Sequence, residues 1–180
     1  MDEKFKKLIE LGAGEVNHID GILIDHLFGT QELLKEWNAS GTLQKAGLYH
    51  ATYGTSGFNS MLISDEKRDE VAKIIGNEAE EIVYLYCACD RDYFWPQIGV
   101  AVEPQYKNRF TGHLSVLNKQ QLCDFCELTV ANELEIAIDN SPFLNKYGKK
   151  LYSVFINMRD YLSKPANNSV ELVLGNIVRS

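Results

Sequence analysis

Apolar residues recur at helical spacing over most of the chain, in stretches that are separated by short polar or glycine-containing breaks. This spacing predicts helices over residues 2–11, 22–37, 42–52, 64–76, 77–90, 118–138 and 141–162. Capping boxes are expected where Asn77 precedes Glu80 and where Asn118 precedes Gln121. The expected fold class is therefore all-α, with a mostly helical chain.

Two stretches depart from helical spacing. Around residues 93–117 the pattern changes to short apolar runs near Trp95-Pro96 and Val100, which predicts an irregular segment or a short hairpin. The tail over residues 170–178 is apolar, and we expect it to dock as a strand or a turn. No repeat, low-complexity tract or linker interrupts the chain, so residues 1–180 are expected to form a single domain.

Composition and charge narrow the classes of function. The apolar fraction of 45% and the charged fraction of 24% are typical of globular proteins. A net charge of −7 argues against a nucleic-acid polymer or an anionic membrane as partner, because both bind clustered Lys and Arg. No window resembles a signal peptide or a membrane span, so a cytoplasmic location is expected. The expected partner is a small-molecule substrate, and a homodimer stays open.

Cysteine usage adds no catalytic motif. The chain has four cysteines, at positions 87, 89, 123 and 126. In a chain without an export signal, free thiols are the default state, and the spacing of these four fits neither a zinc finger nor a redox motif. We therefore expect the cysteines to be core or unreactive thiols.

Histidines are concentrated near the beginning of the chain. Of four histidines, His18, His26 and His50 fall within the first 50 residues, and the last two lie in neighbouring predicted helices among apolar residues. Two imidazoles on adjacent antiparallel helices can converge on one metal ion, because the helices hold both rings rigidly. The alternative is that each is a core histidine, hydrogen-bonded to a neighbouring helix. Both interpretations stay open at this point.

The order of these motifs carries a family resemblance. Asp25-His26-Leu27, then Ala46-Gly47-Leu48-Tyr49-His50, then the apolar run that ends at Asp90 resemble the HD phosphohydrolase superfamily. In that family one helix carries a His, the next ends in His-Asp, and a later helix supplies an Asp. His26, His50 and Asp90 match these positions. The chain is also similar to an uncharacterised HD-like family of small bacterial proteins.

The resemblance implies an HD-domain-like helical bundle that holds a divalent metal ion. His26, His50 and Asp90 would be ligands, with His18 as a further one, a set suited to Fe, Mn, Zn or Ni. Ala51 stands where the family has its Asp. Since this Asp ligates or bridges the metal, a single-ion site is expected in place of a two-metal site.

Further side chains are assigned to the catalytic site. Asp25 would accept a hydrogen bond from a metal-bound histidine and so support it. Tyr53 and Thr55 would place hydroxyls at the mouth of the pocket, with a plain turn as the alternative. Arg91 would contact an anionic substrate, with a solvated side chain as the alternative. The aromatic run at residues 93–95 would line a substrate pocket or join the core.

Three functions follow from these residues. The leading hypothesis is a metal-dependent hydrolase of phosphorylated metabolites or nucleotides, in which a metal-bound water is the nucleophile. The second is a mononuclear or diiron HD-type oxygenase, whose open coordination positions would face an aromatic-walled pocket. The third is a non-catalytic module that binds a ligand or a protein and has lost the metal.

Overall fold

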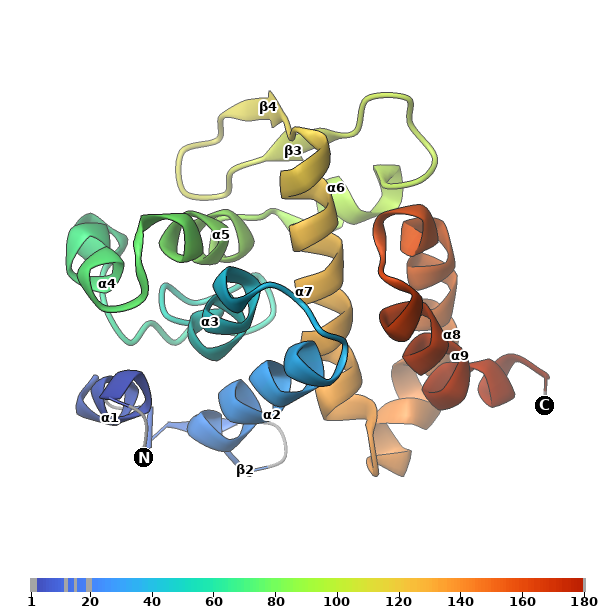
Figure 1. Ribbon diagram of the computed structural model, residues 1–180. Coiled ribbons are helices and arrows are strands. Elements are labelled where there is room, and N and C mark those ends of the chain that lie inside the picture. Colours follow the sequence, from blue (N-terminus) through green and yellow to red (C-terminus); the bar gives the residue numbers. More distant parts are fainter. Residues whose placement is uncertain (1–2, 12, 15, 19–20, 180) are drawn as a thin grey trace.

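Helix α7 forms the centre of the molecule in this computed structural model, which describes residues 3–11, 13–14, 16–18 and 21–179 (Figure 1). α7 (Lys119–Ala137) contacts α2 (Leu23–Glu36), α3 (Gly41–Tyr49) and α5 (Asn77–Cys87) on one side. It contacts α8 (Ser141–Met158) and α9 (Lys164–Arg179) on the other. The expectation of a mostly helical, all-α chain is confirmed.

Shorter elements fill the ends of this arrangement. The shorter helices are α1 (Glu3–Glu10), η1 (Asp65–Lys67), α4 (Arg68–Ile75), α6 (Arg91–Phe94), η2 (Trp95–Gln97) and η3 (Arg159–Tyr161). Strands β1 (Asn17–His18) and β2 (Gly21–Ile22) form one antiparallel pair. Strands β3 (Gln105–Lys107) and β4 (Leu114–Val116) form a second, so the predicted hairpin is confirmed.

The central position of α7 follows from its sequence. Buried residues occupy more than one face of this helix, as expected for a helix that is surrounded by others. The predicted capping box is confirmed at its start: the Gln121 N–H donates to Asn118 Oδ1 at 2.9 Å, and the Asn118 N–H donates to Gln121 Oε1 at 3.0 Å. The buried Glu127 accepts two hydrogen bonds from Ser163, just before α9 begins.

Two predicted features are wrong. Asn77 does not cap α5, because Gly76 takes the capping position and the Glu80 side chain is bonded elsewhere. The tail is part of helix α9 and not a strand or turn. Its buried residues Val170 and Leu174 are four positions apart, which is the spacing of one helix face, and α9 packs on α7 and α8.

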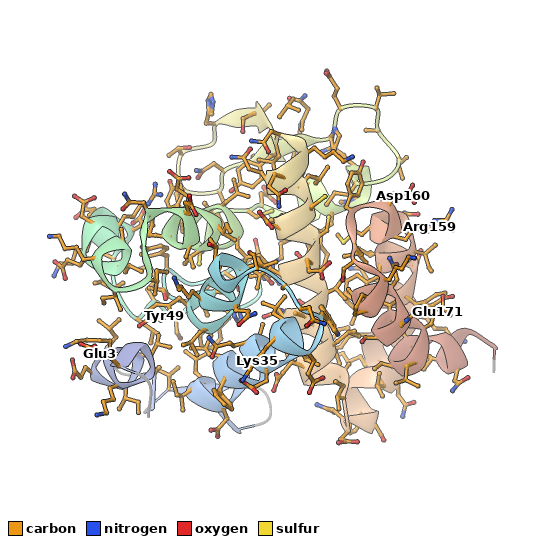
Figure 2. The ribbon with its side chains drawn as sticks, viewed as in Figure 1. Glu3, Lys35, Tyr49, Arg159, Asp160 and Glu171 are labelled. Carbon is orange, nitrogen blue, oxygen red and sulfur yellow. The ribbon has the colours of Figure 1, made fainter. Side chains whose placement is uncertain are left out.

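Charged side chains cover the outside of this fold. Figure 2 labels Glu3, Lys35, Arg159, Asp160 and Glu171, all of which are exposed. Tyr49, labelled in the same view, is fully buried at the end of α3. Of the helices that the structure describes, not one has the length and apolar character needed to cross a membrane.

Candidate functional site

Two of the predicted metal ligands lie against one another. His26 projects from the buried side of α2, and His50 is the residue that ends α3. Their Nε2 atoms are 3.2 Å apart, and the two rings meet edge to face. The exposed fractions are 5% and 1%, so water has little access to either ring. The pairing arises because α2 and α3 pack along each other.

The other nitrogen of each ring is bonded to an acceptor. His26 Nδ1 is hydrogen-bonded to the carboxylate of Glu135 on α7. His50 Nδ1 donates to the Gly47 carbonyl at 2.7 Å. A hydrogen on Nδ1 leaves the neutral imidazole with a lone pair on Nε2. If both imidazoles are neutral, both Nε2 lone pairs are directed to the region between the two rings.

Asn132 on α7 adds a third electron-pair donor. Its Oδ1 lies 3.1 Å from His26 Nε2, and its Nδ2 donates to Glu133 Oε1 at 3.0 Å. The bond to Glu133 orients the amide, because only the nitrogen of the amide can donate to a carboxylate. Two imidazole nitrogens and one amide oxygen thus converge on one place.

A glycine makes room for the carboxylate behind His26. A Cβ added at Gly29 would lie 2.6 Å from Glu135 Oε1 and 2.8 Å from its Cγ. Any larger residue at position 29 would displace the Glu135 side chain from α2. Gly29 therefore allows α7 to bring Glu135 against His26.

The converging atoms face a small cavity of about 100 Å³, which we call the inner cavity. Its polar lining includes His26, His50, Thr55, Arg91, Asn132 and Glu133. Arg91 Nη1 donates to Glu133 Oε1 at 3.1 Å, and the two side chains are 11% and 12% exposed. A nearly buried guanidinium thus lies in the wall of the histidine site.

A wider cavity of about 280 Å³, the outer cavity, adjoins the inner one. The two share Gly57, Arg91, Glu133 and Phe143 in their linings. The outer cavity also contains Trp95, together with Tyr147 and Lys150 from α8. A small molecule in the outer cavity can therefore extend one end toward the histidines.

Thr55 and Arg91, which were predicted as site residues, line the inner cavity. Thr55 Oγ1 accepts the Phe58 N–H at 3.1 Å, so the loop holds this hydroxyl in place. Arg91 is mostly buried and not solvated. Of the aromatic run after it, Trp95 lines the outer cavity and Phe94 joins the core.

Tyr53 does not reach either cavity. It is fully buried, and its hydroxyl donates to Glu80 Oε1 at 2.8 Å. Arg68 donates two further hydrogen bonds to the same carboxylate, at 2.7 and 2.6 Å. Burial and the bond to Glu80 raise the pKa of Tyr53. The side chain thus fastens the loop after α3 to Glu80 on α5.

A conservative substitution tests this structural role. Tyr53→Phe is expected to lower the free energy of unfolding by about 1–3 kcal/mol, because the buried Glu80 loses one of its donors. Metal and ligand binding at the histidines should be unchanged. Urea denaturation measures the first effect and calorimetric titration the second. Unchanged stability together with a large loss of binding would place Tyr53 in the site after all.

Two further predicted site residues, Asp90 and Asp25, lie outside the lining of the inner cavity. Asp90 Oδ1 caps α6 by accepting the Tyr93 N–H at 3.2 Å, and Oδ2 accepts Lys107 Nζ at 2.9 Å. The bond from Lys107 lowers the pKa of Asp90. Asp25 is exposed on α2, and neither aspartate lines the inner cavity. The side chain of His18 lies outside the described residues.

The third converging group is therefore not the one predicted. Across the part of the chain that the structure describes, no three His, Cys, Asp or Glu side chains are placed to hold a metal ion. Asn132 on α7 occupies the place beside the histidines that was assigned to Asp90, and Glu135 has the supporting place that was assigned to Asp25. Their spacing of three positions puts both on one face of the helix, but polar residues recur along α7, so the sequence alone does not single out these two.

The cysteines contribute packing. Cys87, Cys89 and Cys126 are buried free thiols, as expected, and Cys123 is partly exposed. Cys87 Sγ donates to the carbonyl of His50 at 3.0 Å, which helps to hold the end of α3. Burial raises the pKa of the Cys87 thiol to about 12, so it stays protonated near neutral pH.

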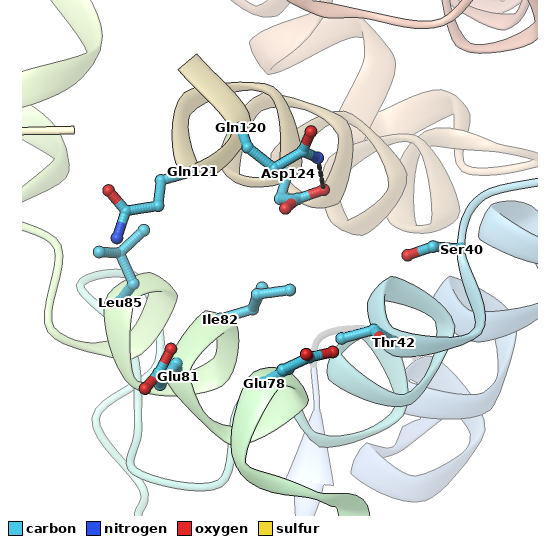
Figure 3. A pocket seen from close by; sticks show the side chains of 9 residues that line it. All are labelled: Ser40, Thr42, Glu78, Glu81, Ile82, Leu85, Gln120, Gln121 and Asp124. Atoms are coloured by element: carbon cyan, nitrogen blue, oxygen red, sulfur yellow. Dashed lines mark hydrogen bonds between the residues drawn. The ribbon is translucent and has the colours of Figure 1, made fainter. Parts of the chain in front are cut away.

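A further cavity, of about 320 Å³, lies between α3, α5 and α7 (Figure 3). Three of its lining residues are acidic, namely Glu78, Glu81 and Asp124. Gln120 Nε2 donates to Asp124 Oδ1 at 3.0 Å, and burial raises the pKa of Asp124. No lining residue is basic, so this cavity is poorly suited to an anionic substrate.

Comparison with known proteins gives a match for a stretch of the chain that contains only some of the site residues. Residues 7–91 match the family model described as "Domain of unknown function (DUF6817)". The matched stretch includes His26, His50 and Arg91, and it ends before α7 with Asn132 and Glu135. None of the curated proteins that were compared matches the chain.

Proposed function

We propose that the protein is a metal-dependent hydrolase of HD-like fold that acts on a phosphorylated small molecule, such as a metabolite or nucleotide. His26, His50 and Asn132 would hold one divalent ion. The observation that carries the proposal is the bonding of the two Nδ1 atoms, to Glu135 and to the Gly47 carbonyl. Histidines that bind metals nearly always donate their second ring N–H to a carboxylate or a backbone carbonyl.

The separations among the three donor atoms support a shared ion. Two ligand atoms at about 2.0–2.2 Å from one ion lie roughly 2.8–3.6 Å apart in octahedral or tetrahedral geometry. The separations of 3.2 Å between the Nε2 atoms and 3.1 Å from His26 Nε2 to Asn132 Oδ1 fall within this range. Imidazole nitrogens with one amide oxygen suit Fe, Mn, Zn or Ni, and three protein ligands leave positions open.

The residues around the ion would position its ligands and the substrate. A bound ion of this type lowers the pKa of a coordinated water and so provides a nucleophile near neutral pH. Glu135 fixes the His26 ring and its tautomer, and Glu133 orients the Asn132 amide. Arg91 supplies positive charge in the wall of the inner cavity, where it can orient an anionic group.

A shared proton is the competing explanation for the same geometry. If one Nε2 carries a proton, it can donate to the other Nε2 or to Asn132 Oδ1, and Glu135 then balances the charge of an imidazolium. In that case the site needs no metal. The protein would then be a ligand-binding module, the third function considered from the sequence.

Metal content separates the two explanations. Protein purified without chelator should contain close to one equivalent of metal, and His26→Ala/His50→Ala should lose it. His113→Ala is the matched control, because His113 is exposed in the β3–β4 connection. The metal-loaded protein should hydrolyse p-nitrophenyl phosphate and the double variant should not. No bound metal, and no thermal shift with Fe, Mn, Zn or Ni, would favour the shared proton.

A further inference from the structure

Buried hydrogen-bond donors without an acceptor gather around Arg91. Within the described part of the chain, four buried side-chain polar atoms lack a hydrogen-bond partner, and three of them belong to Tyr86, Arg91 and Trp95. The Arg91 guanidinium carbon is 4.8 Å from the centre of the Tyr86 ring and 5.1 Å from that of Trp95. Buried donors are nearly always satisfied, so this cluster points to an acceptor from outside the chain.

Two of these donors belong to residues that line the outer cavity. Arg91 and Trp95 both line it, and their unpaired atoms are Nε and Nε1. Glu133 engages Arg91 through Nη1, at the opposite edge of the guanidinium from Nε. The Nε edge of a guanidinium can bind both oxygens of a carboxylate through two parallel hydrogen bonds. The chain itself uses only part of the binding capacity of Arg91.

The charges around the outer cavity favour a ligand group with one negative charge over a group with two. Arg91 and Lys150 are balanced by Asp92 and Glu133, all four of which line the cavity. A multiply charged group such as a phosphate dianion would meet two carboxylates within the same space, which raises its electrostatic cost. A single carboxylate carries half of that charge, so the repulsion it meets from the same two carboxylates is about half as large.

The apolar part of the lining favours a flat ligand body. Trp95, Phe143 and Tyr147 supply three aromatic side chains, and the cavity measures about 280 Å³. The rings of Phe143 and Tyr147 are in contact, with centroids 5.0 Å apart, so they form a continuous surface on α8. Aromatic walls of this kind bind planar apolar groups by stacking and burial.

We propose that the outer cavity binds a monocarboxylate with a flat apolar body. Its carboxylate accepts hydrogen bonds from Arg91 Nε and Trp95 Nε1, and its body packs on Phe143 and Tyr147. The carboxylate site does not depend on the proposed function. The assignment of this acid as substrate does rest on it, because the phosphoryl group of the same molecule would then lie in the inner cavity, at the end away from the carboxylate.

Three probes of one shape test the proposal: phenylacetate, the neutral phenylacetamide and phenyl phosphate. Titration calorimetry is expected to show saturable binding of phenylacetate, with at least tenfold weaker binding of phenylacetamide. Phenyl phosphate should bind no more tightly than phenylacetate. Absence of phenylacetate binding at millimolar concentration, or a tenfold preference for phenyl phosphate, would overturn the proposal.

Two neighbouring lysines provide a matched pair of variants. Lys150→Gln removes a positive charge from the lining and should weaken phenylacetate binding by about threefold or more. Lys149→Gln removes a charge that is also exposed but lies outside the lining, and it should change binding by less than twofold. Arg91→Lys keeps the charge but loses the Nε donor, so at least tenfold weaker binding is expected. Equal effects of the two glutamine variants would contradict the placement of the anion.

Titration of metal-free protein separates this proposal from the proposed function. Phenylacetate binding with the expected preferences, in protein that takes up no metal, would sustain the carboxylate site and reject the hydrolase. Stoichiometric metal without phenylacetate binding would reject the carboxylate site and leave the hydrolase standing.

Discussion

Glu135→Gln is expected to lower the affinity of the inner cavity for a divalent ion by about 10–100-fold. The carboxylate of Glu135 is hydrogen-bonded to His26 Nδ1, and its charge makes Nε2 a stronger electron-pair donor. Glutamine keeps the size of the side chain and an acceptor oxygen but removes the charge. Because Glu135 is partly exposed, at 24%, little change in folding stability is expected. Competition with a metal-binding dye measures the affinity, and urea denaturation measures the stability.

Gly29→Ala is expected to lower the metal affinity through a different structural change. The added methyl group would lie 2.6 Å from Glu135 Oε1, so the carboxylate must move away from α2. Metal affinity should fall although no bonded residue is altered. Gly41→Ala is the control, since a Cβ at that position meets nothing within 4 Å. Unchanged metal affinity in both Glu135→Gln and Gly29→Ala would show that Glu135 does not support a metal ligand.

The sequence could predict those site residues that lie close together along the chain. His26 and His50 lie on consecutive helices, and helical spacing alone places both on buried faces. Asn132 is separated from His26 by 106 positions, and its approach depends on how α7 packs against α2. Local periodicity contains no information about that packing, and Asp90 was assigned to this place from the family resemblance, whose pattern ends in an Asp.

Competition for one carboxylate explains the failed capping box. Asn77 and Glu80 have the right spacing for it, yet the Glu80 side chain is only 5% exposed and is bonded to Arg68 and Tyr53. Charge-assisted hydrogen bonds in a buried setting are stronger than the exposed backbone contact that a capping box offers. A spacing rule considers only neighbours in the chain, whereas the folded chain also supplied Tyr53, 27 positions away.

Gly99→Ala is expected to be the most destabilising of the substitutions considered. Gly99 has φ +71°, and a Cβ there would lie 1.9 Å from the carbonyl oxygen of Asn157 in α8. A backbone atom cannot rotate away as a side chain can, so α8 itself must shift. The left-handed φ and the overpacking together are expected to cost about 2–5 kcal/mol of unfolding free energy. Urea denaturation of the purified variant measures this loss.

Gly112→Ala separates the two contributions, because Gly112 has a similar φ of +74° and a Cβ there meets nothing within 4 Å. It should cost only the conformational part, about 1–2 kcal/mol. The difference in unfolding free energy between the two variants then measures the contribution of the contact between Gly99 and α8.

The contact between Gly99 and α8 also bears on the outer cavity. It connects the segment that follows Trp95 to the helix that carries Tyr147, and both of these residues line the cavity. Gly99→Ala should therefore also weaken phenylacetate binding while metal binding at His26 and His50 persists. Equal costs for the two variants would show that α8 can move away from Gly99 freely, and the outer cavity would then lack a rigid wall.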